Sequence, residues 1–147
     1  MSHPSDAEQK LLQLLSGKWV TAALAAAAEL GIADALAPAP LTAAQLAQRL
    51  GCDATALARL LRVWCGEGLL EVDVEGCYRI TPVGAQLRSG QLRELARFVG
   101  APFMWTPWAE LADALRDTQR SAFERAHGHP LFAHLDQSPH DAAVYHQ

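Results

Sequence analysis

The sequence predicts a mostly helical fold built on a winged helix-turn-helix core with a small β-hairpin wing. Apolar residues recur at helical spacing along most of the chain, and this pattern changes to strict alternation for a few residues after Leu70. Half of the 147 residues are hydrophobic and 19% are charged, which is typical of a globular protein. A chain of this length can bury a core without disulfides or metal ions.

About residues 1–40 are predicted to form N-terminal helices. The first helix should begin near Asp6, and Gly17 is expected to break or bend it. The following stretch, TAALAAAAEL, has high helix propensity and small side chains, so another helix can approach it closely. Gly31 and the APAP run then end the region. The large apolar residues of the first helix are Leu11, Leu12, Leu14, Leu15, Trp19, Val20 and Leu24.

Residues 41–90 are predicted to form the winged helix-turn-helix core. Thr42 and Gln45 have the spacing of a capping box, and Gly51 stands where the helix they open should end. Asp53 can cap the next helix, in which four large apolar residues at positions i, i+3, i+4 and i+7 form one stripe. These residues are Leu57, Leu60, Leu61 and Trp64.

The wing of this core is predicted from a change of period. From Leu70 to Glu75, apolar and acidic side chains alternate, as in a half-buried strand. Glu75-Gly76 offers a turn, and the segment CYRIT provides the return strand. A short helix is expected from Val83 to Leu87.

Residues 91–147 are predicted to form C-terminal helices. Pro107 should open a helix that places Trp108 in the core, on one face with Leu111, Ala112 and Leu115. Ser121 and Glu124 form a second capping box. A final helix should begin after Ser138-Pro139 and continue to Gln147.

A DNA-binding transcription regulator is the alternative function for a winged helix. The outward face of the second core helix carries Thr55, Ala58, Arg59 and Arg62, which is little for reading bases. The expected wing carries Glu71, Asp73 and Glu75, which would repel phosphate. Residues 42–90 hold five basic and five acidic side chains, and the whole chain has a net charge of −4. The charges therefore predict no nucleic-acid partner.

The order of segments along the chain resembles the amino-terminal domain of small-molecule O-methyltransferases that use S-adenosylmethionine, of the plant phenolic and bacterial antibiotic-tailoring type. The segments are GKWVTAALAAAAELGIADAL, LTAAQLAQRLG, ALARLLRVWCGEGLLE, GCYRITPVGAQL, WAELADALR, SAFERAHGHPLFAHL and SPHDAAVYHQ. The resemblance implies a homodimer held by flanking dimerisation helices that interlock between subunits. It also implies a lid over a small aromatic or polyketide-like acceptor whose hydroxyl is methylated.

The family's catalytic Rossmann-like domain is not expected in residues 1–147. Gly66-Glu67-Gly68 is followed by Leu-Leu-Glu, so the glycine-rich pattern for a nucleotide-like cofactor fails. We therefore predict no catalytic and no cofactor-binding residue on this chain and no activity of the chain alone. In the complete enzyme, S-adenosylmethionine would be the cofactor.

An aromatic stretch, RFVGAPFMWTPWAEL, provides the candidate substrate-lid residues. Glycine and proline interrupt it, so its large side chains cannot share one helix face. In the family that the chain resembles, this stretch and the last helix contribute apolar walls around the substrate. The candidates are Phe98, Phe103, Met104, Trp105 and Tyr145.

The remaining residues predict no further site. Five of the six histidines fall between His127 and His146 without a recognised ligand spacing, so we expect exposed side chains and no metal. Three cysteines, an odd number, favour a cytoplasmic protein in which Cys65 is a buried small apolar residue. The longest apolar run, Val20 to Ala28, is too short to span a membrane, so no membrane contact is expected.

Overall fold

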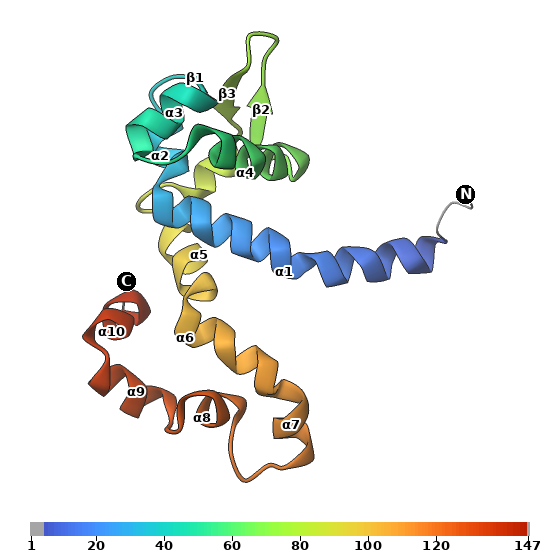
Figure 1. Cartoon of the computed structure of the whole chain (residues 1–147), viewed down its shortest axis with the longest axis vertical. Helices are drawn as coiled ribbons and strands as arrows, with labels where there is room; N and C mark the ends of the chain where they lie inside the picture. Colours follow the sequence, from blue (N-terminus) through green and yellow to red (C-terminus); the bar gives the residue numbers. More distant parts are fainter. Residues whose placement is uncertain (1–4, 147) are drawn as a thin grey trace.

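The computed structural model describes residues 5–146 and is mostly helical, with one small antiparallel sheet. The long helix α1 crosses the molecule, with α2–α4 and the sheet on one side and α5–α10 on the other (Figure 1). The helices are α1 (Asp6–Leu30), α2 (Ile32–Leu36), α3 (Ala43–Leu50), α4 (Ala54–Gly66), η1 (Gly84–Leu87), α5 (Arg93–Gly100), α6 (Pro102–Trp105), η2 (Thr106–Glu110), α7 (Leu111–Arg116), α8 (Ala122–His127), α9 (Leu131–Gln137) and α10 (Pro139–Tyr145). The strands are β1 (Leu41–Thr42), β2 (Leu70–Val72) and β3 (Cys77–Ile80).

Helix α1 is continuous through Gly17, so the predicted break there is wrong, whereas the alternative of a bend stays a prediction. A capping box of Ser5 and Glu8 opens the helix, and Gly31 ends it in the left-handed conformation that glycine favours. Two leucines precede Gly17 by two and three residues, an alanine-rich stretch follows it within the same helix, and the hydroxyl of Thr21 donates to the Gly17 carbonyl at 2.9 Å. A single glycine costs only about 1 kcal/mol in a helix interior, which its neighbours offset.

Two helices and a hairpin follow in the order predicted from the sequence. The Thr42–Gln45 capping box opens α3, and the side chain of Asp53 accepts from the backbone N–H of Ala56 to cap α4. The predicted stripe of α4 faces inward: Leu57, Leu61 and Trp64 are buried and Leu60 is half-buried. The predicted stripe is therefore confirmed. A helix of 13 residues places side chains three and four positions apart on one face, so the whole stripe can be buried together.

The sheet has the predicted hairpin and one strand that was not predicted. Strands β2 and β3 pair antiparallel, with Leu70 opposite Ile80, and the carboxylate of Asp73 accepts two backbone N–H bonds in the turn. Strand β1 pairs with the other side of β3, with Leu41 opposite Tyr78. A strand of two residues has no periodicity of its own, so only its long-range pairing defines it.

The main core lies between α4, α2, α3 and the second half of α1. The indole N–H of Trp64, a fully buried side chain, donates to the carbonyl of Ala23 on α1 at 3.4 Å. The buried residues of this core are Ala27, Ile32, Ala33, Leu36, Leu46, Ala47, Leu57, Leu61, Trp64, Leu69, Leu70 and Leu87. This body therefore completes its burial within the chain.

An ion-pair network ties the start of α5 to α2. The carboxylate of Asp34 accepts from the Ser89 hydroxyl at 2.7 Å and from Arg93 at 3.1 Å, and Arg88 lies 3.8 Å away. Burial raises the pKa of Asp34, but the hydrogen bonds from Ser89 and the charges of Arg93 and Arg88 outweigh it, so the pKa lies below its usual value.

Helix α5 packs against α1 at a point of very close approach. A Cβ atom added at Gly100 would lie 2.0 Å from the Cβ of Ala25, so only glycine fits there. The alanine-rich stretch of α1, predicted to allow close packing of another helix, thus packs against α5. Beyond this joint, α6–α10 fold back toward α5 (Figure 1) and bury only Ala101, Phe103 and Leu135 in a second cluster.

The C-terminal region departs from two expectations. Trp108, predicted to lie in the core, is 70% exposed, and Leu115 on the same predicted face is 75% exposed. Helical spacing groups apolar side chains on one side but does not supply what covers them. The last helix, α10, ends at Tyr145, and Gln147 lies outside the described residues.

Helix α1 has the length and hydropathy of a membrane span, in contrast to the short apolar run from which the sequence predicts none. Within residues 5–146 it is the one helix that is long and apolar enough to cross a bilayer by length and composition, and 11% of the qualifying stretch is buried. The apolar run considered in the sequence was shorter than this helix. Length and hydropathy do not separate a membrane span from an interface helix, so the absence of membrane contact stays a prediction.

Candidate functional site

Four of the five predicted lid residues lie together between α5–α6 and α9–α10. The ring of Phe98 makes edge-to-face contacts with Phe103 at 6.2 Å and with Tyr145 at 5.7 Å between centroids. Phe103 is buried, and Met104 and Tyr145 pack around it and Leu135. We call Phe98, Phe103, Met104 and Tyr145 the aromatic cluster. Such edge-to-face geometry is favourable between rings and forms an apolar wall.

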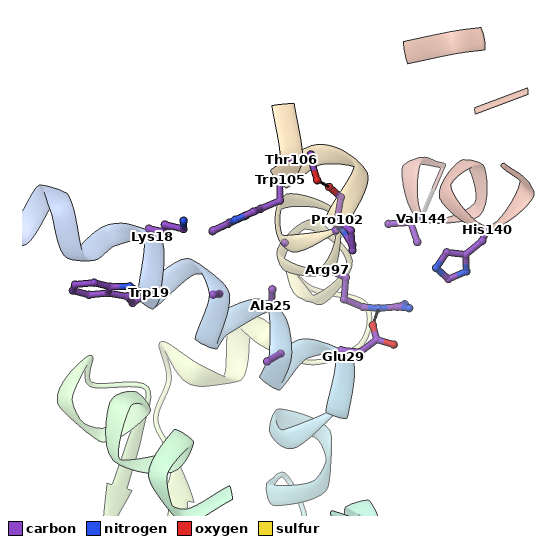
Figure 2. A pocket seen from close by; sticks show the side chains of 14 residues that line it. Lys18, Trp19, Ala25, Glu29, Arg97, Pro102, Trp105, Thr106, His140 and Val144 are labelled. Carbon is purple, nitrogen blue, oxygen red and sulfur yellow. Dashed lines mark hydrogen bonds and ion pairs between the residues drawn. The ribbon is translucent and has the colours of Figure 1, made fainter. Parts of the chain in front are cut away.

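The fifth predicted residue, Trp105, points away from this cluster toward α1. Figure 2 shows its side chain extending from α6 toward Lys18. It lines a groove of about 610 Å³ between α1, α5, α6 and α10. The groove is otherwise lined by Lys18, Trp19, Ala22, Ala25, Ala26, Glu29, Arg97, Gly100, Ala101, Pro102, Thr106, His140 and Val144. A second hollow of about 550 Å³ lies beside Trp105, lined also by Val99 and Trp108.

The charged side chains of the groove lie at different places along it, and Arg97 forms ion pairs with two carboxylates. The guanidinium of Arg97 donates to Glu29 at 2.7 Å and to Glu94 at 2.8 Å. The hydrogen bond to Glu29 and then that to Glu94 raise the pKa of Arg97 further above neutrality, so it stays charged. Lys18 is exposed at the other end of the groove, next to Trp19 (Figure 2).

Three histidines form a second group of rings in contact. The ring of His134 lies 4.7 Å from His127 and 5.4 Å from His129, and it stacks on Phe103 at 5.8 Å. We call His127, His129 and His134 the histidine cluster. All three are half-buried, so the expectation of exposed histidines is wrong for these three, although His140 and His146 are exposed. The rings meet because His127 ends α8 and His134 lies on the next helix, α9, a contact that the sequence pattern does not predict.

The structure offers no metal-binding group among residues 5–146. Spacing alone could not exclude such a group, because residues far apart in sequence can converge. His3 lies outside the described residues.

The cysteines are free thiols and are less buried than expected. Cys52, Cys65 and Cys77 are all half-buried. Partial burial raises the pKa of the Cys65 thiol, so it carries less of the reactive thiolate.

The charges on the hairpin and on α4 lie where the sequence placed them. Arg59 and Arg62 are exposed on α4, and Glu71, Asp73 and Glu75 are exposed on the hairpin. An exposed acidic hairpin is unfavourable beside phosphates. The charge distribution therefore continues to disfavour the regulator interpretation.

The groove and the contacts that connect the C-terminal helices are not predictable from the sequence pattern. Trp19 is visibly apolar, but nothing in the sequence places it in one groove with Trp105 and Val144. The contact of His134 with Asp141, at 2.7 Å, is not predicted either. Its one local signal is the Ser138-Pro139 helix start, which places Asp141 in the first turn of α10.

Comparison with known proteins identifies the family. A family model described as the O-methyltransferase dimerisation domain matches residues 12–89, more than half of the chain. The 3-amino-4-hydroxybenzoate 4-O-methyltransferase of Streptomyces cremeus is 38% identical over 97% of this chain. The chain spans 40% of that enzyme's length.

Solved structures agree in fold over nearly the whole chain. The crystal structure of N,N-8-amino-8-demethyl-D-riboflavin dimethyltransferase from Streptomyces davawensis matches with a TM-score of 0.84 and 32% identity, over 97% of this chain and 42% of that one. Human N-acetylserotonin methyltransferase in complex with SAM (S-adenosylmethionine) matches with a TM-score of 0.86 and 27% identity, over 99% and 45%. This chain belongs to the family of O-methyltransferase dimerisation domains.

Proposed function

We propose that this chain is the dimerisation and substrate-lid domain of an S-adenosylmethionine-dependent O-methyltransferase, with a winged-helix core as its scaffold. The acceptor would be a hydroxyl of a small aromatic or polyketide-like molecule. Methyl transfer would be carried out by a catalytic domain of the kind that the resemblance implies. The chain spans less than half the length of the relatives it matches, so this activity is a proposal for the complete enzyme.

The exposed apolar face of α1 carries the dimer part of this proposal. In its first half, Leu11, Leu12, Leu14, Leu15 and Trp19 are all more than half exposed. This half of α1 extends beyond the body of the molecule (Figure 1). A contiguous apolar face of this kind is rare on a monomer and typical of an interface. A homodimer would cover the same face on both copies.

The groove is continuous with this face. Trp19 belongs to the exposed set and also lines the groove (Figure 2). Trp108 and Val99, which are also exposed, line the neighbouring hollow. Apolar surface on α1, α5 and η2 would thus be covered together, which favours interlocked helices over a contact through α1 alone.

The dimer is tested by the mass of the chain in solution. We expect twice the 15.9 kDa of one chain by light scattering at about 50 µM. The variant Leu12→Glu/Leu15→Glu places charges on the exposed face. It should have the mass of a monomer by light scattering and the helix content of a folded protein by circular dichroism. Val74→Glu, on the exposed hairpin turn, is the matched control and should remain dimeric. A wild-type monomer at this concentration contradicts the proposal.

The aromatic cluster supports the lid part of the proposal. It presents apolar side chains from elements on two sides, α5–α6 and α10, around a buried ring. A wall of this kind excludes water and orients a flat acceptor next to a methyl donor. Trp105 stays a candidate, but its position in the groove favours a contact with the second subunit.

The lid is tested in a chimera in which this chain replaces the matching part of the Streptomyces cremeus enzyme. We expect methylation of 3-amino-4-hydroxybenzoate, and we expect Tyr145→Ala to raise KM about tenfold because an apolar contact is lost. Val83→Ala, exposed on the winged-helix side, should leave KM unchanged. The chain alone should show no S-adenosylmethionine binding by calorimetry.

A further inference from the structure

The histidine cluster connects the C-terminal helices to one another and to α6. The Nε2 atom of His127, at the end of α8, lies 2.9 Å from the carbonyl oxygen of Phe103. Because a carbonyl only accepts, this nitrogen carries the proton and donates it. His134 on α9 contacts the carboxylate of Asp141 on α10 at 2.7 Å. The rings therefore join α8 to α6 and α9 to α10.

A positive charge on His134 has a partner in Asp141. His134 and Asp141 are both mostly buried, with 16% and 20% of their side chains exposed. Burial raises the pKa of Asp141, but hydrogen bonds from His134 and Ser138 outweigh it and hold the pKa below its usual value. Asp141 is thus a carboxylate over the whole range in which imidazoles titrate. A proton on His134 is compensated by this contact.

A positive charge on His127 or His129 has no such carboxylate partner among residues 5–146. Among residues 5–146, neither His127 nor His129 forms an ion pair with a carboxylate, and Nε2 of His129 is buried without a hydrogen bond. Their rings lie 4.7 and 5.4 Å from that of His134. Two like charges at this separation, screened little by solvent, repel each other.

The neighbouring charged groups do not supply the missing carboxylate. On α8, Arg125 pairs with Asp117 at 2.6 Å, and its Nε is buried without a partner, while Glu124 is bound by the Ser121 cap. Asp113 pairs with Arg116 on α7. The other titratable groups on the packed elements are Glu110 on η2, Asp136 on α9, and His140 and Tyr145 on α10.

We propose that the histidine cluster is a pH-sensitive switch. It holds α8, α9 and α10 against Phe103 at neutral pH, and it loosens them in acid, when a second ring carries a positive charge. The loosened state separates the rings and so binds more protons, and acid therefore favours it. Phe103 belongs to the aromatic cluster, so loosening would also open the lid wall. This last consequence rests on the proposed function, whereas the switch itself does not.

Amide hydrogen exchange of the 147-residue chain at pH 7.5 and 5.5 tests the switch. After correction for intrinsic exchange rates, α9 and α10 should lose about tenfold in protection at the lower pH, relative to α4. The variant His127→Gln/His129→Gln removes two imidazole rings, while the side-chain amide introduced at position 127 can still donate to the carbonyl of Phe103. It should keep its protection at pH 5.5. His146→Gln, outside the cluster, should behave as wild type.

Equal protection of wild-type α9 and α10 at both pH values overturns the proposal, as does an equal loss in wild type and the double variant. If the double variant fails to fold, His129→Gln alone, which removes one of the two imidazole rings next to His134, should reduce the loss about threefold. An undiminished loss in that variant also overturns the proposal. Mass measured at both pH values shows separately whether the dimer persists, so failure of the switch is distinguishable from failure of the proposed function.

Discussion

The body built from the second half of α1, α2–α4, the sheet and η1 differs sharply from the C-terminal region of α5–α10. The first buries twelve apolar residues in one cluster around Trp64, whereas the second buries three around Phe103. Both regions contain large apolar side chains, but in the second many of them stay exposed, including Trp108 and Leu115. The difference shows which part of the chain completes its own core and which part leaves large apolar side chains exposed.

The largest expected effect is the loss of the central side chain of the first region. Trp64 is 1% exposed and bonded to the backbone of α1, so Trp64→Ala leaves a cavity at the junction of α1 and α4. We expect a loss of about 3–5 kcal/mol in the free energy of unfolding, measured by urea denaturation. If Phe103→Ala caused this loss and Trp64→Ala caused none, the C-terminal cluster and not the cluster around Trp64 would be the main core.

The joint between the two regions should be less sensitive but still specific. At Gly100 a methyl group would overlap Ala25, so Gly100→Ala must push α5 away from α1 and should cost about 1–3 kcal/mol. Gly17→Ala is the matched control, because nothing lies within 4 Å of its added Cβ. It should stabilise α1 by about 0.5–1 kcal/mol in the same thermal and urea measurements. Equal effects at both positions would show that the close approach has no energetic role.

The ion-pair network beside this joint should contribute less, and only above acidic pH. Asp34→Asn removes the charge that accepts from Arg93 and Ser89, and at one-third exposure we expect a loss of about 1 kcal/mol at pH 7. The folded pKa of Asp34 is lowered, so its contribution is complete above its unfolded pKa of about 4 and disappears as pH falls through the folded value. The difference between variant and wild type should therefore be constant above about pH 5 and shrink below about pH 4. A difference that persists at pH 2.5 would contradict this assignment.

How well the sequence predicts a feature depends on the distance along the chain between the residues that form it. Thr42, Gln45 and the α4 stripe could be predicted because caps and helical periodicity depend on residues within one or two turns. The exposure of Trp108 and the pairing of β1 could not, because each depends on segments distant in the sequence. The aromatic cluster lies between these cases: resemblance selected its members, but the separation of Trp105 from Phe103 follows from the direction in which α6 leaves α5.

The smallest effect on the folded monomer is expected at the exposed leucines of α1, and it separates an interface from a merely apolar surface. Leu12→Ala removes a side chain that is 59% exposed, so at low concentration the free energy of unfolding should change by less than about 0.5 kcal/mol. Because only the folded state dimerises, the wild-type urea midpoint should rise with protein concentration, while that of Leu12→Ala should rise less. A wild-type midpoint that is independent of concentration from about 1 to 100 µM would leave the face of α1 without a second copy to cover it, and the long apolar helix would then need a different partner.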